Sequence, residues 1–145
     1  MKVVLQRVKQ AKVTVNGAVV GYINRGILIF LGIHADDTTQ QADYLAAKCA
    51  ELRIFSDSDD KMNFSIKDIQ GEALVISQFT LYGDCRKGRR PSYTHAAPPS
   101  KGNELYEYYV KKLKNYIKIV QTGIFGAMMD VEMINDGPVT IILER

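Results

Sequence analysis

The longest apolar run in the chain is Gly26-Ile27-Leu28-Ile29-Phe30-Leu31-Gly32-Ile33. An extended chain with apolar side chains on both faces is typical of a strand that is covered on both sides or lies at an interface. At eight residues, the run is far shorter than the roughly 20 residues that a membrane-spanning helix needs. It therefore predicts the centre of a sheet in a soluble protein.

Strand and turn signals precede this run. Val3 to Val8 is apolar and β-branched. Lys12 to Val15 and Ala18 to Val20 flank Asn16-Gly17, and an Asn-Gly pair between two such runs is the strongest short signal of a β-hairpin. Asn24-Arg25-Gly26 predicts the turn that leads into the apolar run.

More strands are expected later in the chain. Ser56 to Asp60 is acidic and predicts a solvated loop. Ala73 to Leu81 predicts a strand. Ala127 to Ile134 and Val139 to Leu143 predict two further strands, separated by Asn135-Asp136-Gly137-Pro138.

Two helices complete the pattern. A capping box that starts at Asp37 or at Thr38 predicts the first helix. Asn103 is the expected cap of a second helix that reaches about Gln121. The apolar positions that recur at helical spacing are Ala42, Leu45, Cys49 and Leu52 in the first helix and Leu105, Tyr109, Leu113, Tyr116, Ile117 and Val120 in the second. Two helices among many short strands predict an α+β fold with a compact β-barrel-like core and a single domain, residues 1–145.

The composition excludes several classes of protein. The 145 residues are 46% hydrophobic and 24% charged, which excludes a disordered or fibrous chain. The net charge of +3 mildly favours anionic partners. Two cysteines cannot make a disulfide framework, so we expect a reducing environment. The N-terminus has no signal-peptide h-region and no apolar run is long enough to span a membrane, so we expect a cytoplasmic protein without a membrane partner. The cysteines and histidines lie at positions 34, 49, 85 and 95, which is not zinc-site spacing, so no metal or cofactor is expected.

Polar residues end the strand that starts at Ala73. The polar end, Ser77-Gln78-Phe79-Thr80, follows the four apolar residues Ala73 to Ile76. Polar groups at the end of a core strand must find protein partners or contact a ligand. In a strand, Ser77 and Phe79 would share one face, and Gln78 and Thr80 would share the other. Ser77 lacks a Gly-x-Ser-x-Gly elbow, so no serine nucleophile is indicated.

Three further features each leave alternatives open. The segment Arg86-Lys87-Gly88-Arg89-Arg90 suits phosphate contacts, or it is a solvated loop. Cys85 and His95 could form a thiol dyad, although their spacing alone is weak evidence. Gly137-Pro138 is either a plain turn or a cis peptide, which X-Pro bonds permit.

Taken together, these segments resemble the D-aminoacyl-tRNA deacylases (the D-tyrosyl-tRNA(Tyr) deacylase family). The resemblance spans the whole chain in order, with one departure at Tyr93, where the family has phenylalanine. The segments that carry it are Gln6-Arg7-Val8, Asn16-Gly17, Gly26 to Gly32, Ser77-Gln78-Phe79-Thr80-Leu81, Lys87-Gly88-Arg89-Arg90-Pro91-Ser92, Phe125-Gly126-Ala127-Met128-Met129 and Asn135-Asp136-Gly137-Pro138-Val139-Thr140.

The resemblance implies a specific activity. Members of this family are homodimers that hydrolyse the ester between a D-amino acid, or glycine, and the terminal adenosine of tRNA. Ser77, Gln78, Phe79 and Thr80 would line the active site, and Gly137-Pro138 would be a cis dipeptide that enters the partner subunit's site and rejects L-aminoacyl groups. The expected substrate or tRNA contacts are Arg7, Lys87, Arg89, Arg90, Phe125 and Met129. Aminoacyl-tRNA is thus the expected partner, and DNA is not.

Two chemical routes and several other classes remain as hypotheses. In the first route, backbone N–H groups near Phe79 and Thr80 polarise the ester and the 2′-hydroxyl of the terminal adenosine assists water. In the second, Thr80 is a nucleophile that forms an acyl-enzyme. The other classes are a non-catalytic RNA-binding module, a cysteine hydrolase built on Cys85 and His95, and a relative that removes L-alanine from mischarged tRNA.

Overall fold

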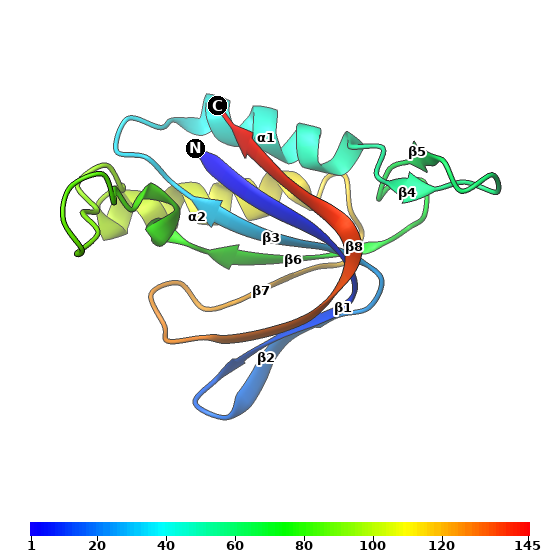
Figure 1. Cartoon of the computed structure of the whole chain (residues 1–145), viewed down its shortest axis with the longest axis horizontal. Coiled ribbons are helices and arrows are strands. Elements are labelled where there is room, and N and C mark those ends of the chain that lie inside the picture. Colours follow the sequence, from blue (N-terminus) through cyan, green and yellow to red (C-terminus); the bar gives the residue numbers. More distant parts are fainter.

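A strongly curved sheet forms the framework of the chain in the computed structural model, which describes residues 1–145 (Figure 1). Five strands follow the order β2-β1-β3-β6-β7, and β8 pairs with β1. Their bounds are Lys2–Val15 (β1), Ala18–Ile23 (β2), Gly26–Gly32 (β3), Glu72–Ser77 (β6), Val120–Thr122 (β7) and Asp130–Glu144 (β8). A separate small hairpin consists of β4 (Phe55–Ser56) and β5 (Met62–Phe64).

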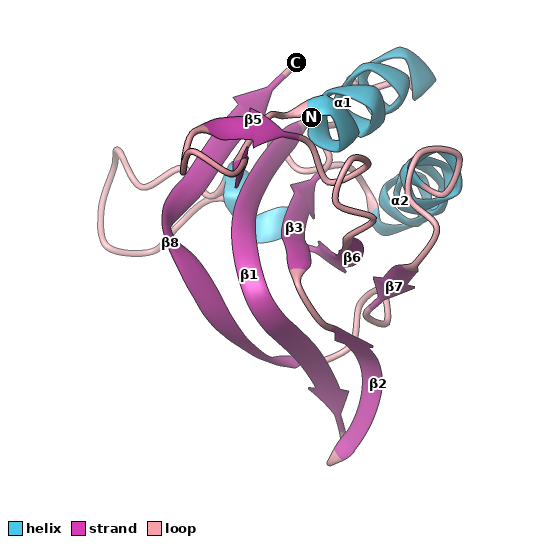
Figure 2. Ribbon diagram, turned by 90° about the vertical axis from the view of Figure 1, so that its right-hand side faces the viewer, coloured by secondary structure: helices cyan, strands magenta, loops and turns pink.

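The two helices lie on one side of the sheet (Figure 2). They are α1 (Thr39–Glu51) and α2 (Pro99–Leu113), and they pack against each other. Thr38 caps α1 through a capping box with Gln41, so the second of the two expected boxes forms. Asp37 instead accepts a hydrogen bond from the backbone N–H of His34 at 2.7 Å. This confirms the expected α+β fold with a barrel-like sheet and two main helices.

The apolar run forms β3, which is the central strand that the sequence predicts. β3 pairs with β1 on one side and runs parallel to β6 on the other. Ile27, Ile29 and Leu31 belong to the core cluster beneath the helices, whereas Leu28 belongs to the cluster on the opposite face. Both faces of the strand are therefore covered within one chain, which explains why no alternation appears in its sequence.

The Asn16-Gly17 hairpin forms as expected. Both residues have positive φ, 49° for Asn16 and 79° for Gly17, as a type I′ turn requires. The turn joins β1 to β2, with Val15 opposite Ala18.

The end of the chain differs from the prediction. β8 is one bent strand that pairs with β1 along most of its length, so the two expected strands with a turn between them are wrong. The segment Asn135–Pro138 forms an irregularity within this strand: Gln6 lies opposite Thr140, and Val8 lies opposite Asn135. The Asn135 side-chain amide donates to the carbonyls of Arg7 and Val139, at 3.0 and 3.2 Å, and so bridges the irregularity. The Gly137–Pro138 peptide bond within it is cis.

The second helix is also shifted from its expected bounds. It starts at Pro99, because proline needs no backbone donor in the first turn, and Asn103 lies inside it rather than at its cap. It ends at Leu113 instead of about Gln121, and Val120 pairs with Ala73 in β7. Ile117 is nevertheless buried in the core beyond the helix.

Candidate active site

Strand β6 ends where the predicted polar segment begins. The backbone N–H of Gln78 still donates to the carbonyl of Leu31 at 2.8 Å. The chain then enters a 3-10 turn, η1 (Phe79–Tyr82), so the expected strand to Leu81 is too long. The expected two-faced alternation of Ser77 to Thr80 is wrong beyond Gln78, because the period of a 3-10 turn is three residues and that of a strand is two.

A glycine makes room for this turn. A Cβ on Gly32 would lie 3.0 Å from the Cβ of Leu81 and 3.1 Å from the carbonyl oxygen of Gln78. The Leu81 N–H donates to that carbonyl at 3.2 Å, which closes the turn. The turn at the end of β6 therefore depends on the absence of a side chain at Gly32 of the neighbouring strand.

The turn exposes its aromatic and hydroxyl side chains. Phe79 is 58% exposed, which is unusual for a phenylalanine, and Thr80 is exposed as well. The side-chain amide of Gln78 donates to Oγ1 of Thr80. The Phe79 ring meets the edge of Tyr93 at a centroid distance of 5.0 Å, so the departure at Tyr93 preserves a ring contact. An exposed aromatic ring beside a hydroxyl suits contact with a ligand.

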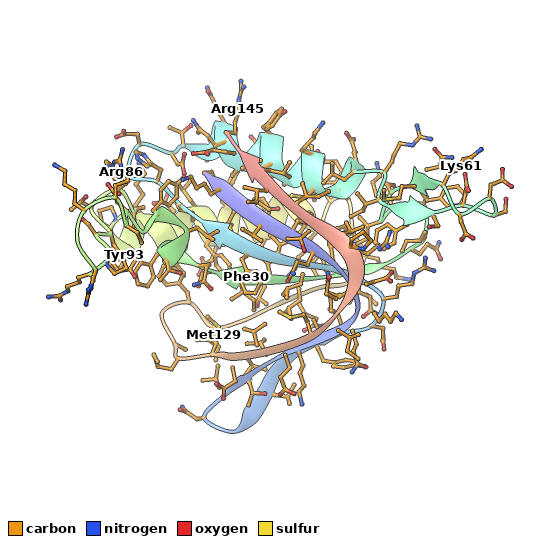
Figure 3. All side chains as sticks on the ribbon, in the orientation of Figure 1. Phe30, Lys61, Arg86, Tyr93, Met129 and Arg145 are labelled. Carbon is orange, nitrogen blue, oxygen red and sulfur yellow. The ribbon has the colours of Figure 1, made fainter.

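Met129 comes close to the end of β6, and Phe125 packs against α2. A Cβ on Gly123 would lie 2.5 Å from Met129 Sδ and 3.2 Å from a methyl group of Ile76, the residue before Ser77. Figure 3 shows Met129 and Phe30 on the same side of β3, away from the helices. The Phe125 ring packs against Tyr106 at 5.9 Å. The fold thus brings Met129 beside the strand that carries Ser77, whereas Phe125 lies against Tyr106 of α2.

Tyr106 is a residue of this region that the sequence analysis does not single out. Its hydroxyl donates to the carbonyl of Val75 at 2.8 Å, and the N–H of Gly123 donates to the same carbonyl at 3.1 Å. Burial raises the pKa of Tyr106 well above its usual value. Tyr106 thus links α2 to β6 two residues before Ser77, and no local sequence signal distinguishes it from the other core tyrosines.

The basic loop that follows η1 leaves three of its four cations unpaired. Arg86 forms a fork with Asp84, at 2.9 and 2.7 Å, and these hydrogen bonds hold the pKa of Asp84 far below its usual range. Lys87, Arg89 and Arg90 are exposed and form no ion pair with another residue. Figure 3 places Arg86 and Tyr93 at the same end of the molecule, so this charge lies beside the turn.

Arg7 is placed differently from the other expected contacts. It is only 9% exposed, and its guanidinium donates to the carbonyls of Asp136 and Ile54 and pairs with the Asp136 carboxylate at 3.0 Å. A buried guanidinium that already has these partners favours a bracing role over direct RNA contact. Arg7 therefore holds the segment that leads into Gly137.

Gly137-Pro138 lies far from Ser77 of the same chain. The dipeptide lies opposite Arg7, which pairs with Ile27, whereas Ser77 pairs with Leu31. The two sites are thus separated by four residues along the strands, about 13 Å, and by three strand spacings, about 14 Å across the sheet. In Figure 1 the bend of β8 and the turn after β6 lie at opposite ends of the sheet. Both Gly137 and Pro138 are exposed.

Cys85 and His95 line one open pocket of about 660 Å³, but they do not form a dyad. The Cys85 thiol contacts only the carbonyl of Gly83, at 4.0 Å. His95 stacks on His34 at 5.8 Å. This geometry offers no activated thiolate.

No cluster of three or more His, Cys, Asp or Glu side chains has an arrangement that would hold a metal ion. Neither α1 nor α2 has the length and apolar composition that a membrane-spanning helix requires.

Comparison with known proteins gives one consistent family. The model of the D-Tyr-tRNA(Tyr) deacylase family matches residues 4–144. A D-aminoacyl-tRNA deacylase of Exiguobacterium sibiricum is 55% identical over 145 residues, which is 100% of both chains. One of Thermotoga petrophila is 56% identical over 144 residues, 99% of this chain and 97% of the relative.

Two solved structures share the fold. A protein described as c-Myc DNA Unwinding Element Binding Protein has a TM-score of 0.94 and 39% identity, covering 100% of this chain and 99% of its own. A probable eukaryotic D-amino acid tRNA deacylase has a TM-score of 0.84 at 18% identity, covering 98% of this chain and 97% of its own, which shows the fold alone. The whole-chain match, together with relatives more than half identical over their full length, shows that this chain belongs to the D-Tyr-tRNA(Tyr) deacylase family.

Proposed function

We propose that this protein hydrolyses the ester bond of D-aminoacyl-tRNA and releases the free D-amino acid and tRNA. The observation that carries the proposal is the match over residues 4–144, together with relatives of the same length that are named D-aminoacyl-tRNA deacylase. Such an enzyme returns tRNA to use and keeps D-residues out of translation. The exposed turn at the end of β6 is the proposed place of the reaction.

The reaction requires little of the protein's own side chains. Water attacks the ester carbon, the bond to the ribose oxygen breaks, and that oxygen takes a proton. The first N–H groups of a helical turn have no partner within it, so those of Phe79 and Thr80 are suited to stabilise the developing oxyanion. The 2′-hydroxyl of the terminal adenosine then positions or activates the water. Ser77 and Gln78 would complete the wall of the site.

The surroundings of Thr80 favour this RNA-assisted route over an acyl-enzyme. Its hydroxyl accepts a hydrogen bond from the Gln78 amide. An amide cannot take up a proton, and no histidine, lysine or carboxylate hydrogen-bonds to this hydroxyl. A threonine without a base is a poor nucleophile.

We also propose that Gly137-Pro138 of a second copy selects the chirality of the substrate in a homodimer. The same chain's dipeptide lies about 13 Å along and about 14 Å across the sheet from Ser77, so a partner is the simpler source. Glycine lets the backbone approach a substrate closely, and proline fixes its own φ. A rigid backbone placed where an L side chain would project rejects L-aminoacyl groups by exclusion.

This exclusion predicts a broad substrate range. The filter makes no use of the identity of a D side chain, and glycine has no β-carbon to reject. Many D-aminoacyl-tRNAs, and glycine mischarged on tRNA(Ala), are therefore proposed substrates. The unpaired Lys87, Arg89 and Arg90 would contact tRNA phosphates beside the site.

The test is the release of amino acid from D-Tyr-tRNA and L-Tyr-tRNA by the purified protein. We expect release from the D-ester only. Binding of both tRNAs with release from neither would instead support a non-catalytic nucleic-acid-binding module. One structural neighbour is described as a DNA unwinding element binding protein, so duplex DNA is a useful competitor, which we expect to be weak.

A further inference from the structure

A groove runs along α2 beside the candidate site. It has a volume of about 410 Å³, which is within the range of small-ligand pockets. Phe125, from the segment after β7, lines one side of it. Its other lining residues include Asn103, Tyr106, Glu107, Lys111 and Lys114 of α2 and its C-cap.

The groove carries the free positive charge of α2. Lys112 pairs with Asp43 at 3.0 Å, and Lys101 donates to the carbonyl of Ala35 at 2.5 Å. Lys111 and Lys114 are exposed and form no ion pair, even though Glu107 lies one turn before Lys111. Residues three apart lie on the same face of a helix, so the two ammonium groups can bind one strand of phosphates.

The same groove offers groups that recognise a base. Glu107 accepts a hydrogen bond from Asn103 through Oε1, at 3.0 Å, and its other carboxylate oxygen has no protein partner. A carboxylate repels phosphate but accepts a hydrogen bond from the exocyclic amine of cytosine. Phe125 supplies an aromatic ring, and unpaired bases stack on such rings.

We propose that this groove binds the nucleotide that precedes the terminal adenosine, which is a cytidine in mature tRNA. Its phosphates lie at Lys111 and Lys114, and its amine lies at Glu107. The proposal rests on the proposed function. The position of the groove next to the candidate site is consistent with it, because Tyr106 packs against Phe125 and donates a hydrogen bond to the carbonyl of Val75, two residues before Ser77.

The main test removes the two lysines. We expect Lys111→Ala/Lys114→Ala to raise the KM for D-Tyr-tRNA about tenfold and to reduce the salt slope of log kcat/KM by about 1.4, as loss of two single-strand phosphate contacts requires. Lys9→Ala/Lys61→Ala removes the same charge from exposed lysines elsewhere, and we expect neither change to follow. Lys111→Arg/Lys114→Arg keeps the charge and is expected to restore the KM.

Truncated and altered substrates test the site itself. With D-tyrosyl-adenosine, which lacks the cytidine and every phosphate, the alanine and control variants are expected to show the same KM. Replacement of the penultimate cytidine by uridine is expected to raise the wild-type KM about tenfold and to have little effect on Glu107→Gln.

Two results would overturn the groove proposal alone. One is an equal KM for the alanine variant and its control with D-Tyr-tRNA. The other is a rise in KM that persists with D-tyrosyl-adenosine. Failure of the wild-type protein to release D-tyrosine from either substrate would instead overturn the proposed function and the groove proposal with it.

Discussion

Thr80 distinguishes the two chemical routes at the scale of a single residue. We expect Thr80→Ala to slow turnover of D-Tyr-tRNA less than about tenfold, because the hydroxyl has no base to activate it. We expect a substrate that ends in 2′-deoxyadenosine to react at least about 100-fold more slowly, the usual contribution of one proton-transferring group. Single-turnover kinetics would measure both effects. The opposite pattern, a dead variant and a reactive deoxy substrate, would establish Thr80 as the nucleophile.

The sequence singles out some candidate site residues, but the surroundings of others depend on distant contacts. Ser77 to Thr80 stand out because polar groups at the end of an apolar strand need partners. Arg7 was expected to contact tRNA because of the resemblance. Its burial depends on Asp136, 129 residues away along the chain, and no local pattern contains that contact.

At the scale of elements, Gly26 allows the start of β3 to lie close to the start of β6. A Cβ there would lie 1.7 Å from the carbonyl oxygen of Glu72, a backbone atom of the neighbouring strand. We expect Gly26→Ala to lower the free energy of unfolding by about 3 kcal/mol or more, since β3 and β6 must separate. Gly88→Ala is the matched control: it meets no atom within 4 Å and is expected to cost about 1 kcal/mol for its positive φ. Urea unfolding measures both, and equal losses would contradict the close approach.

The buried thiol of Cys49 in α1 leads us to expect a loss of stability at alkaline pH. Burial raises the pKa of Cys49 from 9.0 to about 11. Between these values the unfolded thiol ionises while the folded thiol keeps its proton, so the folded state binds more protons and stability falls as pH rises. Two pKa units correspond to about 3 kcal/mol.

Cys49→Ala isolates this effect from that of the buried tyrosines, which also favour the protonated state. Between pH 8 and pH 11 we expect the variant to lose about 3 kcal/mol less than the wild-type protein in urea unfolding. Parallel losses in the two proteins would show that Cys49 ionises normally in the folded chain.

Elements with strong local signals were predicted, and elements set by distant contacts were not. The Asn16-Gly17 hairpin, β3 and the cap of α1 follow from local chemistry. The expected loop at Ser56 to Asp60 overlaps β4 at Ser56 and otherwise connects β4 to β5. These two short strands, in which Phe55 pairs with Phe64, were not predicted. The end of α2 depends on the pairing of Val120 with Ala73, which helical periodicity cannot show.

For the whole molecule, fold class follows from the sequence but strand order does not. The pairing of β1 with β8 places Lys2 opposite Glu144, almost the full length of the chain apart. The resemblance supplies what periodicity cannot, namely that Gly137-Pro138 acts on a second copy. That assignment is still a proposal, and it makes two predictions.

Gly137→Ala is expected to alter function without altering stability. A Cβ there would find only Asn135 Oδ1, at 3.4 Å, so the folded chain accommodates it. We expect unfolding free energy within about 0.5 kcal/mol of wild type. We expect damage instead to D-Tyr-tRNA turnover or to the ratio of D to L release. A change confined to stability would argue against a filter.

The most direct test of the account mixes two variants, each of which is first shown to have lost most of its D-Tyr-tRNA deacylation on its own. One carries Phe79→Ala/Thr80→Ala, and the other carries Gly137→Ala/Pro138→Ala. If each site joins the turn of one chain to the dipeptide of its partner, each mixed dimer has one intact site. An equal mixture after subunit exchange should therefore recover about a quarter of wild-type D-Tyr-tRNA deacylation. Absence of recovery, with mixed dimers shown by mass spectrometry, would contradict a site shared between two copies.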